Sequence, residues 1–216
     1  EMRTPITVLM GFLETVQSLE LKKDQQDQYF DMMMSQAQRM KSLVEDLLTL
    51  ANLESNALPA TNTIVKVGTL MALLKNDAEA LSQGKHSLNF DIHSTENLLG
   101  DEREILSAFS NLVSNAIRYT PDVGAVDVDW KINGQGQGEF SVTDTGPGIA
   151  SEHLSRLTER FYRVDRSRSR DTGGTGLGLA IVKHIANRHQ AQLVIESTPG
   201  RGSKFMLRFP KERVAA

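Results

Sequence analysis

The sequence contains no cysteine, and three kinds of chemistry are excluded with it. A chain without thiols has no disulfide scaffold, no thiolate nucleophile and no sulfur-ligated zinc or iron site, which fits a reducing compartment. The sequence also lacks any run of about 18 apolar residues, the length at which a helix begins to span a bilayer. Charge of one sign is not in excess either, because the formal net charge is -3 and the sequence pI is about 6.0. This balance gives no global attraction to nucleic acid or to anionic lipid.

The composition and the apolar pattern predict a globular protein with a helical N-terminal region. The chain has 216 residues, 39% of them hydrophobic, enough to bury a sizeable core in one large domain or in one domain with an appendage. Two early segments carry helical periodicity, separated by the polar stretch LELKKDQQD, which predicts a turn. The first has apolar residues at Met2, Ile6, Leu9, Leu13 and Val16, and the second at Phe30, Met33, Ala37, Met40, Val44, Leu47 and Ala51.

Steps of three and four along the second segment are typical of a coiled-coil seam. Additional leucines at 43, 48 and 50 widen this stripe beyond what a two-helix hairpin can cover. We therefore expect two hairpins to pair into a dimeric four-helix bundle. The alternative is a hairpin that packs on the rest of its own chain.

After residue 56 the composition and the periodicity change. NALPATNT has the residues of a linker, and alternation with period two then predicts strands at SLNFDIH, VDVDWKI, EFSVTD, QLVIEST and KFMLRF. Helices are predicted at about 69–82, 101–119 and 177–189. These elements do not alternate as regular βαβ units, so we expect an α+β fold, a mixed sheet with helices on one face. The predicted domains are 1–56, the linker 57–63, and 64–216.

Three stretches carry residues suited to a nucleotide. NLVSNAIRYTP places Asn111 and Asn115 on one helical face with Arg118 and Tyr119 beyond them, which offers an amide ligand for Mg²⁺, a cation for phosphate and a ring for a base. The alternative is that these asparagines cap the helix or form a turn. DTGPGI puts Asp144 at a strand end, where a carboxylate can accept a hydrogen bond from an exocyclic amine or simply cap the next helix.

The third stretch, GGTGLGLAIVKH, runs four glycines into an amphipathic helix, so that backbone N–H groups and a positive helix end favour a phosphate. It is neither a P-loop nor a dinucleotide fingerprint. Six arginines and two aromatic residues lie just before it, between 156 and 170. In an acidic chain this pattern favours a lid over a nucleotide rather than a nucleic-acid site.

In this order the three stretches resemble the N, G1 and G2 boxes of the GHKL ATPases, and ERFYRVD is similar to the F box between G1 and G2. The opening EMRTP is similar to the phosphoacceptor motif His-Glu-x-x-Thr-Pro of two-component sensor histidine kinases, without its histidine. The resemblance covers nearly the whole chain. It implies a GHKL α/β sandwich at 64–216 that binds ATP and Mg²⁺, and a dimerisation and phosphotransfer hairpin at 1–56.

The resemblance also assigns roles to individual residues. Asn115 would bind Mg²⁺ with Asn111 beside it, Asp144 would bind the adenine amino group, and the phosphate and nucleotide contacts would come from Arg118 and Tyr119. Glu1 would accept the histidine proton, and Thr4 would position water when a phosphorylated partner is dephosphorylated. The remaining residues implied in ATP binding are Gly146, Gly148, Ile149, Phe161, Arg163, Gly173, Gly174, Thr175, Gly176, Leu177 and Gly178.

Partners and location follow from the same resemblance. The expected partners are a second copy of the chain and the receiver domain of a response regulator. Because the chain starts with Glu1 in mid-pattern, we expect it to be a piece of a longer protein, with the acceptor histidine just upstream and membrane contact only through other segments. The expected location is the cytoplasmic face of a bacterial inner membrane. Without that histidine the chain would be unable to phosphorylate itself, since its five histidines all lie after residue 85 and match surface or packing positions.

A GHKL ATPase that hydrolyses ATP to drive a clamp is the alternative. Such enzymes typically carry a glutamate at the position of Asn111, and an amide cannot accept a proton from water there. A coiled-coil dimerisation module with a degenerate nucleotide fold is the non-enzymatic alternative, and the intact motifs speak against it.

Overall fold

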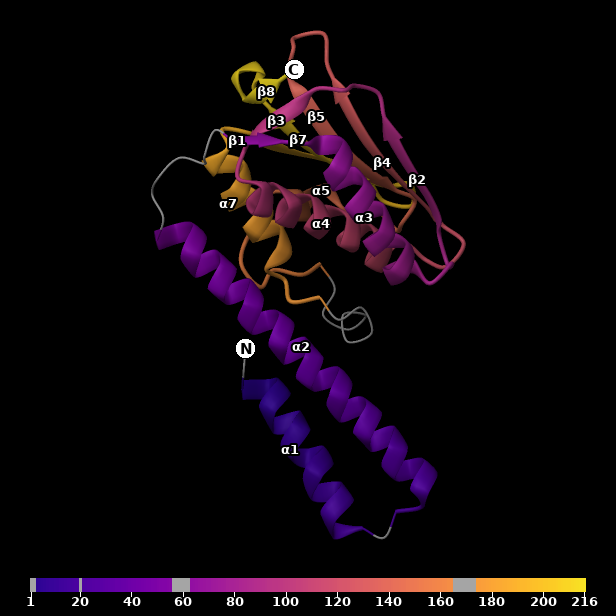
Figure 1. Ribbon diagram of the computed structural model, residues 1–216. Helices are drawn as coiled ribbons and strands as arrows, with labels where there is room; N and C mark the ends of the chain where they lie inside the picture. The colour runs from indigo at the N-terminus through magenta and orange to yellow at the C-terminus, as the bar shows by residue number, and fades with distance from the viewer. Residues whose placement is uncertain (1–2, 20, 56–62, 165–173) are drawn as a thin grey trace.

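The computed structural model describes residues 3–19, 21–55, 63–164 and 174–216 (Figure 1). Two helices form an antiparallel hairpin below an α+β sandwich. The helices are α1 (Arg3–Ser18), α2 (Lys23–Ser55), α3 (Val67–Ser82), α4 (Glu102–Tyr119), α5 (Ser151–Leu154) and α7 (Gly178–Arg188), followed by a 3-10 turn at Lys211–Arg213. The strands are β1 (Thr63–Val65), β2 (Ser87–Ile92), β3 (Asn97–Gly100), β4 (Ala125–Ile132), β5 (Gly138–Asp144), β6 (Gln192–Thr198), β7 (Gly202–Phe209) and β8 (Val214–Ala215).

The α1–α2 hairpin confirms both predicted helices but not the length of the turn between them. Phe12 of α1 packs edge-on against Tyr29 of α2, with ring centroids 5.9 Å apart. The turn predicted over 19–27 is too long, because α2 begins at Lys23. The side chain of Gln25 accepts the N–H of Lys22 at 3.2 Å, and Asp24 lies in the first turn, where the helix dipole favours an anion. Polar residues that look like a turn therefore form the first turn of the helix.

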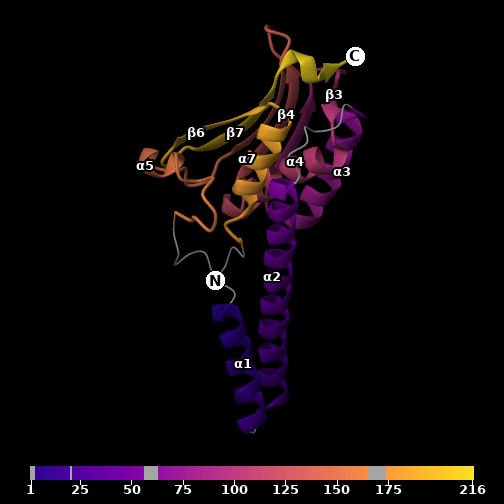
Figure 2. The same cartoon turned by 90° about the vertical axis from the view of Figure 1, so that its left-hand side faces the viewer.

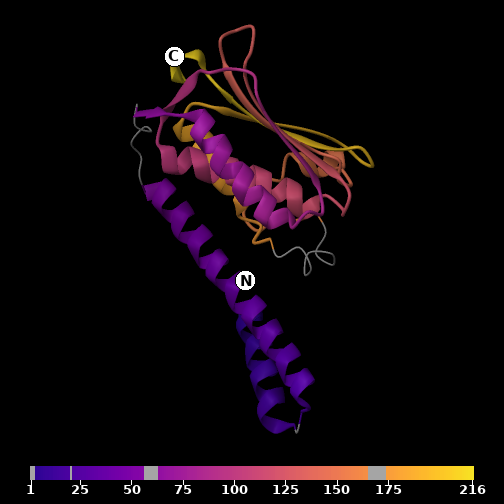
Figure 3. The same ribbon diagram turned by 45° about the vertical axis from the view of Figure 1, so that its right-hand side comes forward.

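The remaining chain confirms the predicted mixed sheet with helices on one face. Five strands lie in the order β2-β4-β5-β7-β6, and only the β2–β4 pair is parallel. Helices α3, α4 and α7 cover one face (Figure 3). A second, three-stranded sheet has the order β1-β3-β8. The sequence did not predict β3, β8 or α5, because two to four residues are too few to display a period.

Alternation along β4 shows why this sheet has a buried and an open face. Val126, Val128 and Trp130 are buried, whereas the residues between them face outward. Phe109 of α4 stacks on Phe140 of β5 with ring centroids 3.6 Å apart. The start of α4 is fixed by the side chain of Asp101, which accepts the N–H groups of the next turn. These contacts place α4 against the centre of the sheet.

The predicted seam of α2 is divided between two neighbours. Met33 is buried in the hairpin, whereas Leu50 and Leu53 near the other end of α2 are buried against the hydrophobic core of the sandwich, with Leu47 packed beside them. Figure 2 shows this end of α2 directly beneath α7. Phe30 and Val44 stay exposed. The hairpin thus packs on its own chain at one end and leaves an apolar stripe open along the rest.

The linker predicted at 57–63 lies outside the described residues except for Thr63, which begins β1. None of the described helices combines the length and the apolar character needed to cross a bilayer.

Candidate functional site

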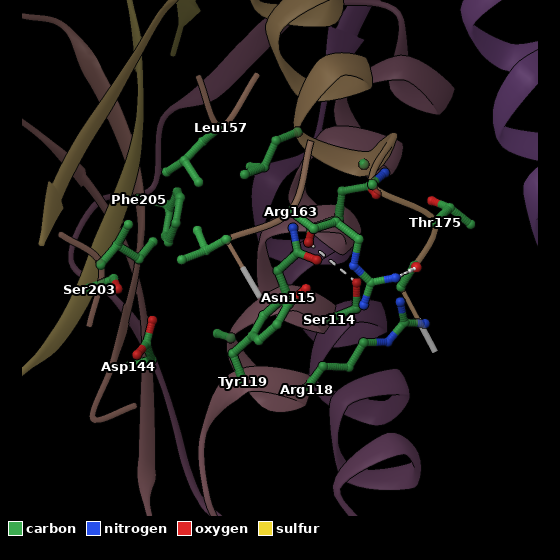
Figure 4. A pocket seen from close by; sticks show the side chains of 18 of the residues that line it. Ser114, Asn115, Arg118, Tyr119, Asp144, Leu157, Arg163, Thr175, Ser203 and Phe205 are labelled. Atoms are coloured by element: carbon green, nitrogen blue, oxygen red, sulfur yellow. Dashed lines mark hydrogen bonds between the residues drawn. The ribbon is translucent and has the colours of Figure 1, made fainter. Parts of the chain in front are cut away.

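A cavity of about 680 Å³ lies where α4, the ends of β5 and β7, the loop after β5 and the start of α7 meet (Figure 4). Helix α2 closes one of its sides with Ser42, Glu45 and Asp46. The predicted residues that line it are Asn111, Asn115, Arg118, Tyr119, Asp144, Gly148, Ile149, Arg163, Gly174, Thr175, Gly176 and Gly178. Three sequence motifs that are far apart in the chain therefore share one cavity.

One wall of the cavity is a face of α4. Asn111 and Asn115 are one turn apart, and the side-chain amide of Asn111 donates to the carbonyl of Ser107 at 2.8 Å. The start of α7 packs closely on this face. A Cβ atom on Gly178 would lie 2.5 Å from Oδ1 of Asn111, so any larger residue there would displace the Asn111 side chain.

Asp144 occupies the opposite end of the cavity from Thr175, beside Ser203 (Figure 4). Its carboxylate is 6% exposed, and Oδ1 accepts the N–H of Gly146 at 2.8 Å. Burial raises the pKa of Asp144, while hydrogen bonds from the backbone of Gly146 and Ser203 act in the opposite direction. The remaining acceptor capacity of this nearly enclosed carboxylate suits a hydrogen-bond donor on a ligand.

The loop after Asp144 is fixed by close backbone contacts. Gly148 has φ +68°, and a Cβ atom there would lie 2.0 Å from the carbonyl oxygen of Thr198. The N–H of Ile149 donates to the hydroxyl of Ser197 at 2.8 Å. Gly148 is therefore required by the approach of the β6–β7 hairpin, whereas Gly146 is required by the approach of Asp144 and the backbone of Tyr119, and Ile149 is left at the cavity wall.

The loop before α7 forms the other end of the cavity. The hydroxyl of Thr175 accepts the N–H of Leu177 at 3.2 Å and donates to Oδ2 of Asp46 at 2.6 Å. Arg163 donates to the carbonyl of Gly174, and the guanidinium groups of Arg163 and Arg118 lie close together on the Thr175 side of the cavity (Figure 4). This end combines two cations with the N-terminus of α7, an arrangement that favours an anion.

Some predicted site residues do not line the cavity. Phe161 packs against the core and donates its N–H to the carbonyl of Gly176 at 2.9 Å, so it ties the ERFYRVD stretch to the glycine loop before α7. Leu177 is fully buried, and Gly146 supports the carboxylate of Asp144. Three further predictions fall on Glu1 and Gly173, which lie outside the described residues, and on Thr4, whose side chain is not described although its backbone lies in the first turn of α1.

Other lining residues were not predicted as site residues. Leu157, Ser203 and Phe205 line the end near Asp144, and no motif marks them. Tyr162 lies among the arginines of ERFYRVD, and the sequence did not predict a role for it. Its hydroxyl hydrogen-bonds Nδ1 of His153 at 2.7 Å, and Arg156 lies 4.3 Å from its ring centroid.

His189 illustrates the packing role expected of the histidines. It is fully buried, and its Nε2 accepts the N–H of Asp101 at 3.1 Å. The other ring nitrogen must then carry the proton and donate it to the carbonyl of Ile185 at 2.9 Å. Burial lowers the pKa of His189, so the neutral ring joins the end of α7 to the start of α4.

Two family models match the chain. Residues 1–56 match the His Kinase A (phospho-acceptor) domain, and residues 100–213 match the histidine kinase-, DNA gyrase B- and HSP90-like ATPases. Together they cover both the hairpin and most of the sandwich, including the whole described cavity.

The relatives are sensor proteins. The phosphate regulon sensor protein PhoR of Pseudomonas aeruginosa is 49% identical over the whole chain, which corresponds to 49% of that protein. The sensor-like histidine kinase SenX3 of Mycolicibacterium smegmatis is 34% identical over 98% of the chain and 55% of its own length. The chain thus spans about half the length of these relatives.

Two solved structures are similar to this chain over nearly its whole length. The histidine kinase AdeS of Acinetobacter baumannii matches with a TM-score of 0.78 and 27% identity, over 98% of both chains. Full-length ShkA, solved in complex with AMPPNP, matches with a TM-score of 0.74 and 26% identity, over the whole of this chain and 45% of that one.

Proposed function

The chain belongs to the sensor histidine kinases, and from this premise we propose that it is a kinase core which binds Mg-ATP and transfers the γ-phosphoryl group to a histidine and then to an aspartate of a response regulator. The observation that carries the proposal is a single cavity with a buried carboxylate at one end and a helix N-terminus beside two arginines at the other. The long arginine-rich motif resembles the phosphate-regulon sensors in particular, and the match to PhoR agrees with that narrower resemblance.

In this proposal adenine lies at the Asp144 end. The carboxylate would accept a hydrogen bond from the exocyclic amine, while Ile149, Leu157 and Phe205 enclose the ring from apolar sides. Adenine is planar and carries one amino group, so it suits a mostly apolar end of the cavity that contains a single buried acceptor.

The phosphates would lie between Arg118 and the start of α7. The N–H groups of the glycine loop and the guanidinium groups would neutralise charge that spreads over the transferred phosphoryl group. Asn115 fits a Mg²⁺ ion held chiefly by ATP, because its neutral amide oxygen is a hard ligand and lines the cavity. The ion would supply charge neutralisation of the phosphates.

The phosphoacceptor would belong to the hairpin. EMRTP completes His-Glu-x-x-Thr-Pro when a histidine directly precedes Glu1. Glu1 would then act as general base on that histidine, and Thr4 would position water in the reverse, phosphatase reaction. The hairpin would dimerise through its exposed apolar stripe and present the histidine to the receiver domain, and any contact of the whole protein with the cytoplasmic face of the inner membrane would come from segments outside this chain.

Transfer is favoured over hydrolysis. A hydrolytic clamp needs a carboxylate that activates water, and the side chain at that position is the amide of Asn111, which already donates to its own helix. The His Kinase A match at 1–56 supports the same choice, because a clamp has no need of a phosphoacceptor domain.

The test compares this chain with a variant that carries one histidine before Glu1. Both are incubated with γ-labelled ATP and Mg²⁺, and the protein-bound label is then exposed to acid and to base. We expect label only on the variant, lost in acid and retained in base, as a phosphohistidine would be. Release of phosphate by both chains without any protein label would favour the clamp.

A further inference from the structure

Helix α2 contributes a negative charge to the cavity described above. Oδ2 of Asp46 accepts the hydroxyl hydrogen of Thr175 at 2.6 Å, and the same hydroxyl accepts the N–H of Leu177. Asp46 is therefore linked through one side chain to the residue before α7 begins. Glu45 and Ser42 of α2 line the same side of the cavity.

This contact is part of a larger docking surface. One and two turns further along α2, Leu50 and Leu53 are 2% and 8% exposed and belong to the core of the sandwich. Glu54 then forms an ion pair with Arg160, and its carboxylate lies 3.4 Å from Nε2 of His184. Because apolar burial and these polar contacts hold the helix on both elements that flank the loop, the position of Asp46 is set by several contacts together.

The carboxylate stands at the end of the cavity that favours anions. The positive charge of Arg118 acts on Asp46 and favours its ionised form, as does the hydrogen bond from Thr175. Burial has the larger effect and raises the pKa of Asp46. The side chain thus occupies the hydroxyl donor of Thr175 and offsets part of the positive charge of Arg118, both of which a phosphate group could otherwise use, and it repels a second anion placed nearby.

We propose that Asp46 sets the selectivity of the cavity between nucleotides by their phosphate charge: with α2 docked, the site disfavours a triphosphate more than a diphosphate, and a bound triphosphate displaces α2. This inference rests on the proposed nucleotide function of the cavity. These two statements are thermodynamically equivalent. A ligand that binds more weakly when α2 is docked must, by linkage, also weaken the docking of α2. The docked arrangement then retains ADP in preference to ATP, and binding of ATP releases α2 from the sandwich.

The test measures binding of the imido analogue of ATP and of ADP by calorimetry, with Mg²⁺, to the chain and to its Asp46→Asn variant. Asparagine keeps one acceptor oxygen for Thr175 and removes the charge, while the other oxygen is replaced by an NH2 donor. We expect the affinity for the triphosphate analogue to rise about tenfold and that for ADP by less than about twofold. Asp31→Asn, the same change at an exposed position of α2, is the matched control and should alter neither affinity.

A second measurement follows the docking itself. Since the chain has no cysteine, Leu53→Cys gives a single thiol at a buried position, and its rate of labelling by a maleimide reports release of α2. The triphosphate analogue should accelerate labelling several-fold more than ADP does, and Asp46→Asn in the same background should remove most of that difference.

The outcomes separate the two levels of the proposal. Equal gains for both nucleotides, or labelling that neither nucleotide changes, would overturn the role of Asp46 and leave the nucleotide site standing. Failure of every variant to bind either nucleotide would overturn the proposed function, and the inference with it.

Discussion

Asp144 is a carboxylate kept almost out of solvent by the end of β5 and the loop that follows it. Its burial raises its pKa, and two backbone amides offset part of the cost of keeping it charged. The sequence could predict this residue as a candidate, because Asp-Thr-Gly-Pro-Gly places a carboxylate at a strand end beside glycines that let the backbone approach closely. It could not predict Leu157, Ser203 or Phe205, whose place at the same end depends on how α5 and β7 pack.

The first prediction concerns that carboxylate. Asp144→Asn replaces two acceptor oxygens by one acceptor and one donor, so the affinity for ATP should fall about 30-fold or more, as expected when a charged hydrogen bond worth about 2–3 kcal/mol is lost. Calorimetry measures the affinity, and circular dichroism checks the fold. Asp122→Asn, at a surface ion pair with Lys85, should bind ATP normally. An unchanged affinity in Asp144→Asn would refute the adenine assignment.

The second prediction concerns the buried His189. Its pKa is lowered in the folded chain, so the neutral ring is favoured by folding, and its stabilising effect is fully present above the ordinary value of 6.5. That effect is lost as the pH falls from 6.5 through the lower, folded pKa, because protonation removes the acceptor that Asp101 uses. For one proton the free energy of unfolding changes by at most about 1.4 kcal/mol per pH unit.

Urea unfolding between pH 7.5 and pH 5 tests this behaviour. His189→Gln should be less stable than the wild type at pH 7.5, because it loses a well-packed ring, and the difference should shrink toward pH 5. His93→Gln, at an exposed ring beside Asp129, is the control. A constant difference across the pH range would contradict a buried neutral His189.

At the scale of elements, periodicity was a reliable guide wherever an element is long enough to repeat. The helices at 102–119 and 178–188 and the five strands of the larger sheet lie where the apolar pattern predicts them, within two or three residues. The predicted start of α2 was wrong because the first turn of this helix is polar and is stabilised by Gln25 and Asp24 rather than by apolar contacts. The seam of α2 has the predicted spacing, but spacing alone does not reveal that two different neighbours share it.

The third prediction concerns the exposed part of that seam. Phe30 is 53% exposed in the hairpin, which leaves it available to a second copy of the chain. Phe30→Glu should raise the dissociation constant of the dimer at least about tenfold, because a charge would be buried in an apolar seam. Sedimentation velocity over a range of concentrations measures it. Gln28→Glu adds the same charge at an exposed position outside the seam and should leave the dimer intact, whereas an unaltered Phe30→Glu dimer would argue against the bundle.

At the scale of the whole molecule, the hairpin and the sandwich share a hydrophobic core. Leu50 and Leu53 belong to α2 by sequence and to the sandwich by packing. The two parts therefore unfold together as long as these contacts hold, and separately when they do not. This coupling could not be predicted from the sequence, because it depends on a contact between segments that are more than a hundred residues apart.

The fourth prediction tests the coupling with two signals. Trp130 is the only tryptophan, is fully buried in β4 and reports the sandwich by fluorescence, whereas circular dichroism is dominated by the helices. In the wild type both signals should give one midpoint of thermal unfolding. Leu50→Ala removes packing worth about 2–5 kcal/mol at the junction, so the part of the helical signal that comes from α1 and α2 should be lost several degrees before the fluorescence and the rest of the helical signal change. Coincident midpoints in Leu50→Ala, with Leu48→Ala at an exposed leucine as control, would count against a shared core.

The apolar residues of the α2 seam that contact the sandwich are repeated at the same spacing further along the helix. Leu47 and Leu50 have counterparts in Met40 and Leu43, seven residues or about 10.5 Å nearer the hairpin turn. Phe12 beside Tyr29 puts Arg3, the first described residue of α1, level with Gln38, and Asp46 stands eight residues, about 12 Å, beyond that level. A sandwich seated two helical turns nearer the hairpin turn would therefore face apolar side chains at the same spacing and would lie beside the start of α1.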